Sequence, residues 1–73
     1  MLIENKLYAI KLKLNNKVTF VEEVTFLKQK DDTLSFSKLS WDGKKLTMFI
    51  CHPNDIKVYK RIEGEWTEFI PYF

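Results

Sequence analysis

Residues 6–20 have the sequence KLYAIKLKLNNKVTF, and this stretch decides the class of fold. Larger apolar side chains recur at every second residue from Tyr8 to Leu14, and such alternation indicates a strand with one face buried and the other in water. Asn15 and Asn16 follow, and asparagine tolerates the positive φ angles of a tight hairpin turn. A second alternating stretch comes directly after them. The sequence therefore predicts a β-hairpin.

The same two-residue rhythm continues along the rest of the chain, broken by short polar segments that contain turn-forming residues. The strongest turn signal is the Asp42-Gly43 pair, which is typical of short hairpin loops. Glu22-Glu23 interrupts the second alternating stretch and indicates a bend or bulge. About six strands joined by short turns are expected, at residues 6–14, from 17 to the turn at 29–32, and at 33–39, 45–51, 56–62 and 66–70.

A helix is the competing interpretation for two segments. Residues 22–30 contain good helix formers, and Asn54 or Asp55 could cap a helix that runs to Ile62. We favour a strand for the second segment, because its Ile, Val and Tyr side chains fit a pleated surface.

The expected fold is all-β, or β-rich with at most one short helix, in a single domain of residues 1–73. The strands would form a small antiparallel meander, arranged as a barrel or a two-layer sandwich. Hydrophobic residues make up 45% of the chain and aromatic residues 15%, which is enough for a dense core. Small barrels of the Src-homology-3 and oligonucleotide-binding types are similar in size and strand count, but a likeness of fold implies no function.

Several expected strands also carry apolar residues on the face assigned to solvent. These residues are Val21, Leu27, Phe49, Tyr59 and Phe69. A barrel or sandwich would cover part of this set, and a partner or a second copy in a homodimer could cover the rest. A self-associating structural subunit is therefore one candidate function.

Residue types for catalysis or metal binding are sparse. Cys51 and His52 are adjacent, but neighbours in a strand point to opposite faces and do not make a nucleophile–base pair. We expect Cys51 to be a buried apolar residue and His52 to lie at the end of a strand. One Cys and one His are too few for a zinc site, and no segment matches a calcium loop. These observations favour a non-enzymatic protein without a metal or another cofactor.

A basic strand face is one candidate binding surface. Lys11 and Lys13 share one face of the first strand, and Lys57, Tyr59 and Arg61 share one face of the fifth. If these strands are neighbours, the five residues form a patch that could hold phosphates and stack a base. The net charge of +2 does not indicate nucleic acid by itself, and lysine on an exposed strand is also ordinary solubilisation.

Aromatic residues provide the other candidate surface. Trp41 lies beside a tight turn, and the chain ends in the aromatic segment FIPYF at residues 69–73. Phe69, Tyr72 and Phe73 either pack on their own domain or, together with Trp41, anchor another protein. Binding of another, unidentified protein is the function we expect first, with nucleic-acid binding as the alternative.

The broader composition bears on where the protein works. Lys, Asn, Ile, Phe and Tyr are abundant, as is typical of AT-rich coding sequences in low-GC bacteria and their phages. The single cysteine, the lack of a visible signal peptide and the lack of a long apolar stretch favour the cytoplasm and no membrane contact. We therefore expect a cytoplasmic accessory protein of a phage or mobile element that inhibits or bridges a host protein.

Overall fold

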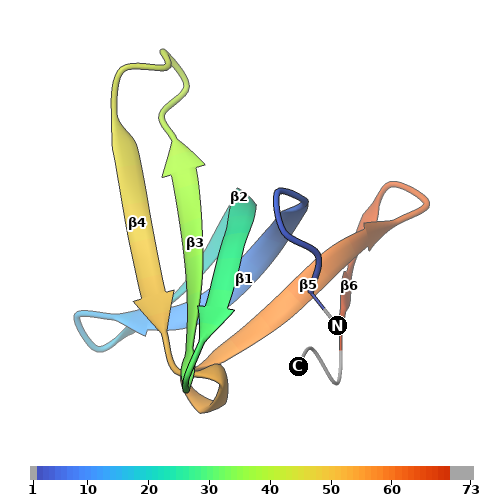
Figure 1. Ribbon diagram of the computed structural model, residues 1–73. Coiled ribbons are helices and arrows are strands. Elements are labelled where there is room, and N and C mark those ends of the chain that lie inside the picture. Colours follow the sequence, from blue (N-terminus) through green and yellow to red (C-terminus); the bar gives the residue numbers. More distant parts are fainter. Residues whose placement is uncertain (1, 70–73) are drawn as a thin grey trace.

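The computed structural model describes residues 2–69 and contains six antiparallel strands in one sheet. The elements are β1 (Leu7–Leu14), β2 (Lys17–Lys30), β3 (Thr33–Leu39), β4 (Leu46–Cys51), the 3₁₀ turn η1 (Pro53–Asp55), β5 (Ile56–Ile62) and β6 (Glu65–Glu68). The strand order is β4-β3-β2-β1-β5-β6, which places β4 and β6 at the two ends of the sheet (Figure 1). The predicted all-β meander is confirmed, and within residues 2–69 the sheet is not closed into a barrel.

The expected turns and strands are largely where the sequence indicates. Asn15 and Asn16 adopt φ angles of 51° and 65° between β1 and β2, as a tight hairpin turn requires. Residues 22–30 belong to β2 rather than to a helix. The only helical turn in residues 2–69 is η1, and the segment after it is the strand β5, as favoured. The last strand ends at Glu68, two residues before the predicted end.

The long strand β2 bends so that both halves of the sheet cover one core (Figure 1). Tyr8 faces Val24 and Ile10 faces Val21, so two steps along β1 correspond to three along β2. The extra residue lies at Glu22-Glu23, and Glu23 has a φ of 56°, which confirms the predicted bulge. A second irregularity separates Phe26 from Lys28 in the pairing with β3.

The core lies between the two halves of the bent sheet. Its buried side chains are Leu2, Tyr8, Ile10, Leu12, Val24, Phe26, Leu34, Phe36, Ile56 and Val58. Phe26 contacts both Tyr8 and Phe36 through its ring, which joins the β1 half of the sheet to the β3 half. Ring contacts of this kind add to the area that the side chains remove from water, and so hold the bend in place.

The bulge corrects one sequence expectation. Alternation alone places Val18 and Phe20 on the same face as Val24 and Phe26, because all four have even numbers. In the structure Val24 and Phe26 are buried, whereas Val18 and Phe20 are exposed and Val21 packs against the core instead. The inserted residue exchanges the two faces of β2, since side-chain direction alternates with every residue.

The face of β4 is likewise the reverse of the expected one. Leu46, Met48 and Ile50 are exposed, while Phe49 and Cys51 pack against the core. Phe69 also packs there, so three residues assigned to the solvent face, Val21, Phe49 and Phe69, lie on the core side. The other two, Leu27 and Tyr59, are partly buried.

Candidate nucleic-acid interface

The two strands that carry the predicted basic residues are neighbours in the sheet. β1 and β5 pair antiparallel, with Lys11 directly opposite Lys57. Lys13 is two residues further along β1 and therefore projects from the same face. The predicted patch required the first and fifth strands to be neighbours, and they are. Lys11, Lys13, Lys57 and Tyr59 therefore lie together on the outer side of β1 and β5.

An exposed aromatic residue that the sequence did not indicate joins this patch. Phe20 of β2 lies opposite Lys11 and contacts the ring of Tyr59, with ring centroids 5.2 Å apart and planes at 74°. Ala9, which pairs with Tyr59 from β1, has no exposed surface. We call Lys11, Lys13, Phe20, Lys57 and Tyr59 the basic face.

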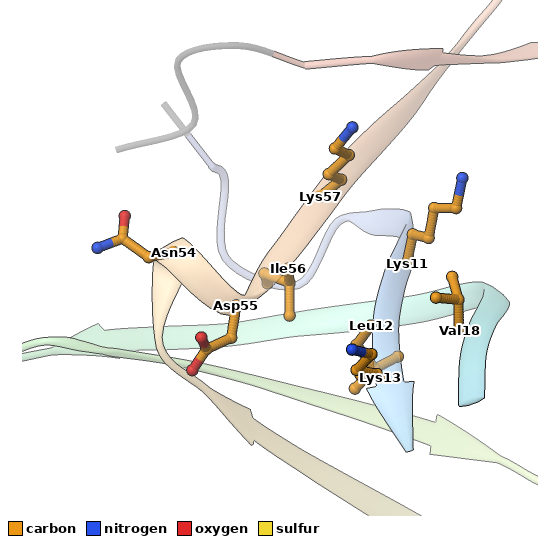
Figure 2. A pocket seen from close by; sticks show the side chains of 8 residues that line it. All are labelled: Lys11, Leu12, Lys13, Val18, Asn54, Asp55, Ile56 and Lys57. Atoms are coloured by element: carbon orange, nitrogen blue, oxygen red, sulfur yellow. The ribbon is translucent and has the colours of Figure 1, made fainter. Parts of the chain in front are cut away.

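A shallow groove of about 400 Å³ lies beside the lysines of the basic face (Figure 2). The lysines reach it from two strands, and Figure 2 shows Lys11 and Lys57 extending to the same side of the ribbon. The remaining lining comes from Leu12, Val18, Asn54, Asp55 and Ile56. Its apolar floor and cationic rim could hold a flat ring against the strands and an anion between the ammonium groups.

The ammonium groups of Lys11, Lys13 and Lys57 make no ion pair or hydrogen bond with another described residue. All three side chains are exposed. Asp55 is the acidic residue of the groove, so the local charge of the four side chains is positive. These cations are therefore available to an anionic ligand.

Arg61, the fifth predicted residue, lies on the same strand but already has a partner. Its guanidinium group stacks over the ring of Trp66, 4.3 Å from the centroid. The Trp66 indole N–H in turn donates a hydrogen bond of 2.8 Å to the Glu22 carboxylate. This contact ties β6 to the bulge of β2, and it leaves Arg61 as a peripheral cation of the basic face.

The aromatic residues predicted to bind a protein are divided by the structure. Phe69 packs on its own domain, where its ring stacks on Tyr8 and its backbone N–H donates to the carbonyl of Val58. Trp41 is 98% exposed in the loop between β3 and β4. Tyr72 and Phe73 lie outside the described residues.

Cys51 and His52 have separate surroundings. Cys51 is half-buried rather than fully buried, and burial followed by the charge of Asp55 raises the pKa of its thiol. His52 is exposed, and its Nδ1 accepts a hydrogen bond from the backbone N–H of Asn54 at the start of η1. Neither contact activates a nucleophile.

The structure also bears on metal binding and on membrane spans. In residues 2–69, no three His, Cys, Asp or Glu side chains gather where they could hold a metal ion. None of the helical segments in the described part of the chain is long and apolar enough to cross a membrane.

Comparison with protein-family models, curated proteins and solved structures finds no match to this chain.

Proposed function

We propose that the protein binds single-stranded nucleic acid across the basic face. The observation that supports this proposal is the direct pairing of Lys11 with Lys57, with Phe20 beside them. Strand pairing holds side chains from three separate segments at fixed spacing, which is what recognition of a repeating phosphate backbone requires.

The aromatic residues favour a single strand over a duplex. Phe20 is 44% exposed, and its contact with Tyr59 limits the rotation of both rings. An exposed ring can stack on a base only if that base has a free face, and bases within a duplex have none. The lysines would then contact the phosphates on either side of the stacked base.

The proposal can be tested by fluorescence anisotropy with labelled single strands of about 12 nucleotides, a length within the range of small β-domains. The test variant is Lys11→Gln/Lys13→Gln/Lys57→Gln, and the control is Lys6→Gln/Lys28→Gln/Lys30→Gln. Each removes three exposed lysines and changes the net charge from +2 to −1. Only the test variant should lose binding. No anisotropy change with the wild-type protein at about 100 µM, or an equal loss in both variants, would refute a dedicated site.

A second candidate function is binding of another protein through Trp41, for example a host protein inhibited by a phage accessory protein. Trp41 is almost fully exposed beside a loop fixed by hydrogen bonds. The Asp42 carboxylate accepts from the Ser40 hydroxyl at 2.5 Å and from the Lys44 backbone N–H at 3.0 Å. A rigid loop loses little entropy on binding, and tryptophan is a frequent anchor in interfaces.

Affinity capture from bacterial lysate separates this candidate from nucleic-acid binding. The wild-type protein should retain a partner that Trp41→Ala loses and that nuclease treatment does not release. Retention of the same partner by Trp41→Ala would exclude the role of this side chain.

A further inference from the structure

The edge strand β4 has an unusual composition for a strand at the end of a sheet. Its sequence, LTMFIC, contains no charged residue and no proline. One side of β4 pairs with β3, and the other side pairs with no described strand. Monomeric β proteins commonly protect such an edge with lysine, proline, a bulge or a covering segment. β4 has none of the first three, and no described strand pairs with its free edge. Lys13 and Leu14 of β1 line a cavity together with Ile50 and Cys51 at the end of β4.

The outward side chains of β4 are apolar as well. Leu46, Met48 and Ile50 are 60%, 49% and 68% exposed. Leu39, which pairs with Leu46 from the end of β3, is also exposed, whereas Ser35 and Ser37 are the cross-strand partners of Ile50 and Met48. We call Leu39, Leu46, Met48 and Ile50 the β4 patch.

The size of this apolar surface is comparable to what an interface needs. The exposed parts of the four side chains of the β4 patch amount to roughly 450 Å². A stable interface buries about 800 Å² on each partner, including polar and backbone atoms. A patch of this size on a small monomer commonly marks a site of interaction.

We propose that a second copy of this chain covers the edge, with β4 of each copy pairing antiparallel across a two-fold axis at Met48. In this register Met48 lies opposite Met48 of the partner, and Leu46 lies opposite the partner's Ile50. All three apolar residues of the outer face then have apolar neighbours about 5 Å away. An axis at Phe49 would instead place Leu46 beside the partner's His52.

The charges at the ends of β4 agree with an antiparallel arrangement. Asp42, Lys44 and Lys45 precede the strand with a net charge of +1, and Asp55 follows it after the turn η1, beside a cavity that Lys13 also lines. Antiparallel pairing brings the basic end of one copy toward the acidic end of the other, whereas parallel pairing brings the lysines together. The two-fold axis also closes the assembly as a dimer, because it uses the free β4 edge of both copies.

The first test is the molar mass by light scattering or sedimentation as a function of concentration, up to about 1 mM. The wild-type protein should shift from monomer to dimer. Met48→Lys places two like charges opposite each other and should weaken association about tenfold or more. Ile62→Lys, at an apolar residue of similar exposure on β5, is the matched control and should dimerise normally. Circular dichroism verifies that both variants are folded.

The second test locates the axis. In a Cys51→Ala background, Met48→Cys should form a disulfide between two copies under mild oxidation, because the residues at the axis face each other. Ile62→Cys in the same background should not. A monomer at every concentration, masses that grow beyond a dimer, or equal dimerisation of wild type and Met48→Lys would overturn the proposal. Growing masses would indicate open-ended edge pairing, and a stable dimer without the Met48→Cys disulfide would place the interface elsewhere.

Discussion

The proposed nucleic-acid site makes a quantitative prediction about salt. Lys11, Lys13 and Lys57 are exposed, lie on one groove and have no ionic partner among the described residues. Each phosphate that a lysine neutralises on a single strand releases counterions and contributes about −0.7 to the slope of log K against log salt concentration. Three contacts therefore give a slope of about −2, and affinity should fall about 20-fold between 50 and 200 mM salt.

The measurement is a series of anisotropy titrations with one labelled oligonucleotide at four or more salt concentrations. Lys57→Gln should reduce the magnitude of the slope by about 0.7, and the triple variant Lys11→Gln/Lys13→Gln/Lys57→Gln should bring it close to zero. If Arg61 leaves Trp66 to meet a fourth phosphate, the wild-type slope becomes about −2.8 and Arg61→Gln returns it to about −2.

The slope distinguishes a site from a general effect of charge. The control variant Lys6→Gln/Lys28→Gln/Lys30→Gln has the same net charge as Lys11→Gln/Lys13→Gln/Lys57→Gln. Its slope should equal that of the wild type. The reasoning is wrong if the three lysines of the groove can be removed without a change in slope, or if both variants lose it equally. Either result would mean that phosphates do not lie along β1 and β5.

Three other predictions follow from individual contacts. Phe20→Ala should weaken single-strand binding by about 1–3 kcal/mol in the same titrations, through loss of stacking, with little change in slope; an unchanged affinity would remove Phe20 from the site. Tyr8→Phe should lower the free energy of unfolding in urea by about 1 kcal/mol, because the Tyr8 hydroxyl accepts a 2.8 Å hydrogen bond from the backbone N–H of Ile3; no loss would mean that water replaces the bond at no cost. Hydrogen bonds from Ser40 and then from the Lys44 backbone lower the pKa of Asp42 below its usual 3.8. Wild type should therefore be more stable than Asp42→Asn above pH 3.8, and its advantage should fade as the pH falls through the lowered pKa; a difference that is constant from pH 2 to 7 would contradict this.

The sequence predicts strand positions well where the hydrophobic rhythm runs without interruption. β3 and β5 have the predicted bounds, because each is a short alternating stretch between turn-forming residues. In β3, Leu34 and Phe36 are fully buried, as the alternation indicates. The same alternation places Ser35 on the solvent face, but Ser35, on a strand between β2 and β4, is also buried.

For a strand with apolar residues at both odd and even positions, the sequence could not predict which face is buried. LTMFIC allows either face of β4 to be the inner one, and the choice depends on the register with β3. That register places Phe49 opposite Phe36 and Cys51 opposite Leu34, which are both core residues. In β2 the bulge could be located from Glu22-Glu23, but the resulting exchange of faces at Phe20 depends on one inserted residue.

In the candidate site, too, the sequence predicts what one strand determines and does not predict which distant strands pair. The basic residues of each strand could be identified from alternation, because their positions in one strand determine the face. The pairing of β1 with β5 joins segments more than 40 residues apart, and the hydrophobic pattern of the sequence does not indicate it. Phe20 and Trp66 were missed for this reason: one depends on the bulge, and the other on a contact between Glu22 and β6.

The two proposed surfaces lie on different strands, which has a consequence for binding. The basic face lies on β2, β1 and β5, and the β4 edge lies at one end of the strand order, with β3 between β4 and β2. Lys13 of the basic face and Ile50 of the β4 patch line one cavity, so a dimer through β4 would bring the basic faces of the two copies close to the interface. A long single strand can contact the two faces at once, and the second contact then occurs at a high effective concentration. Met48→Lys should consequently weaken the binding of long strands much more than that of short ones, whereas loss of the groove lysines should weaken both.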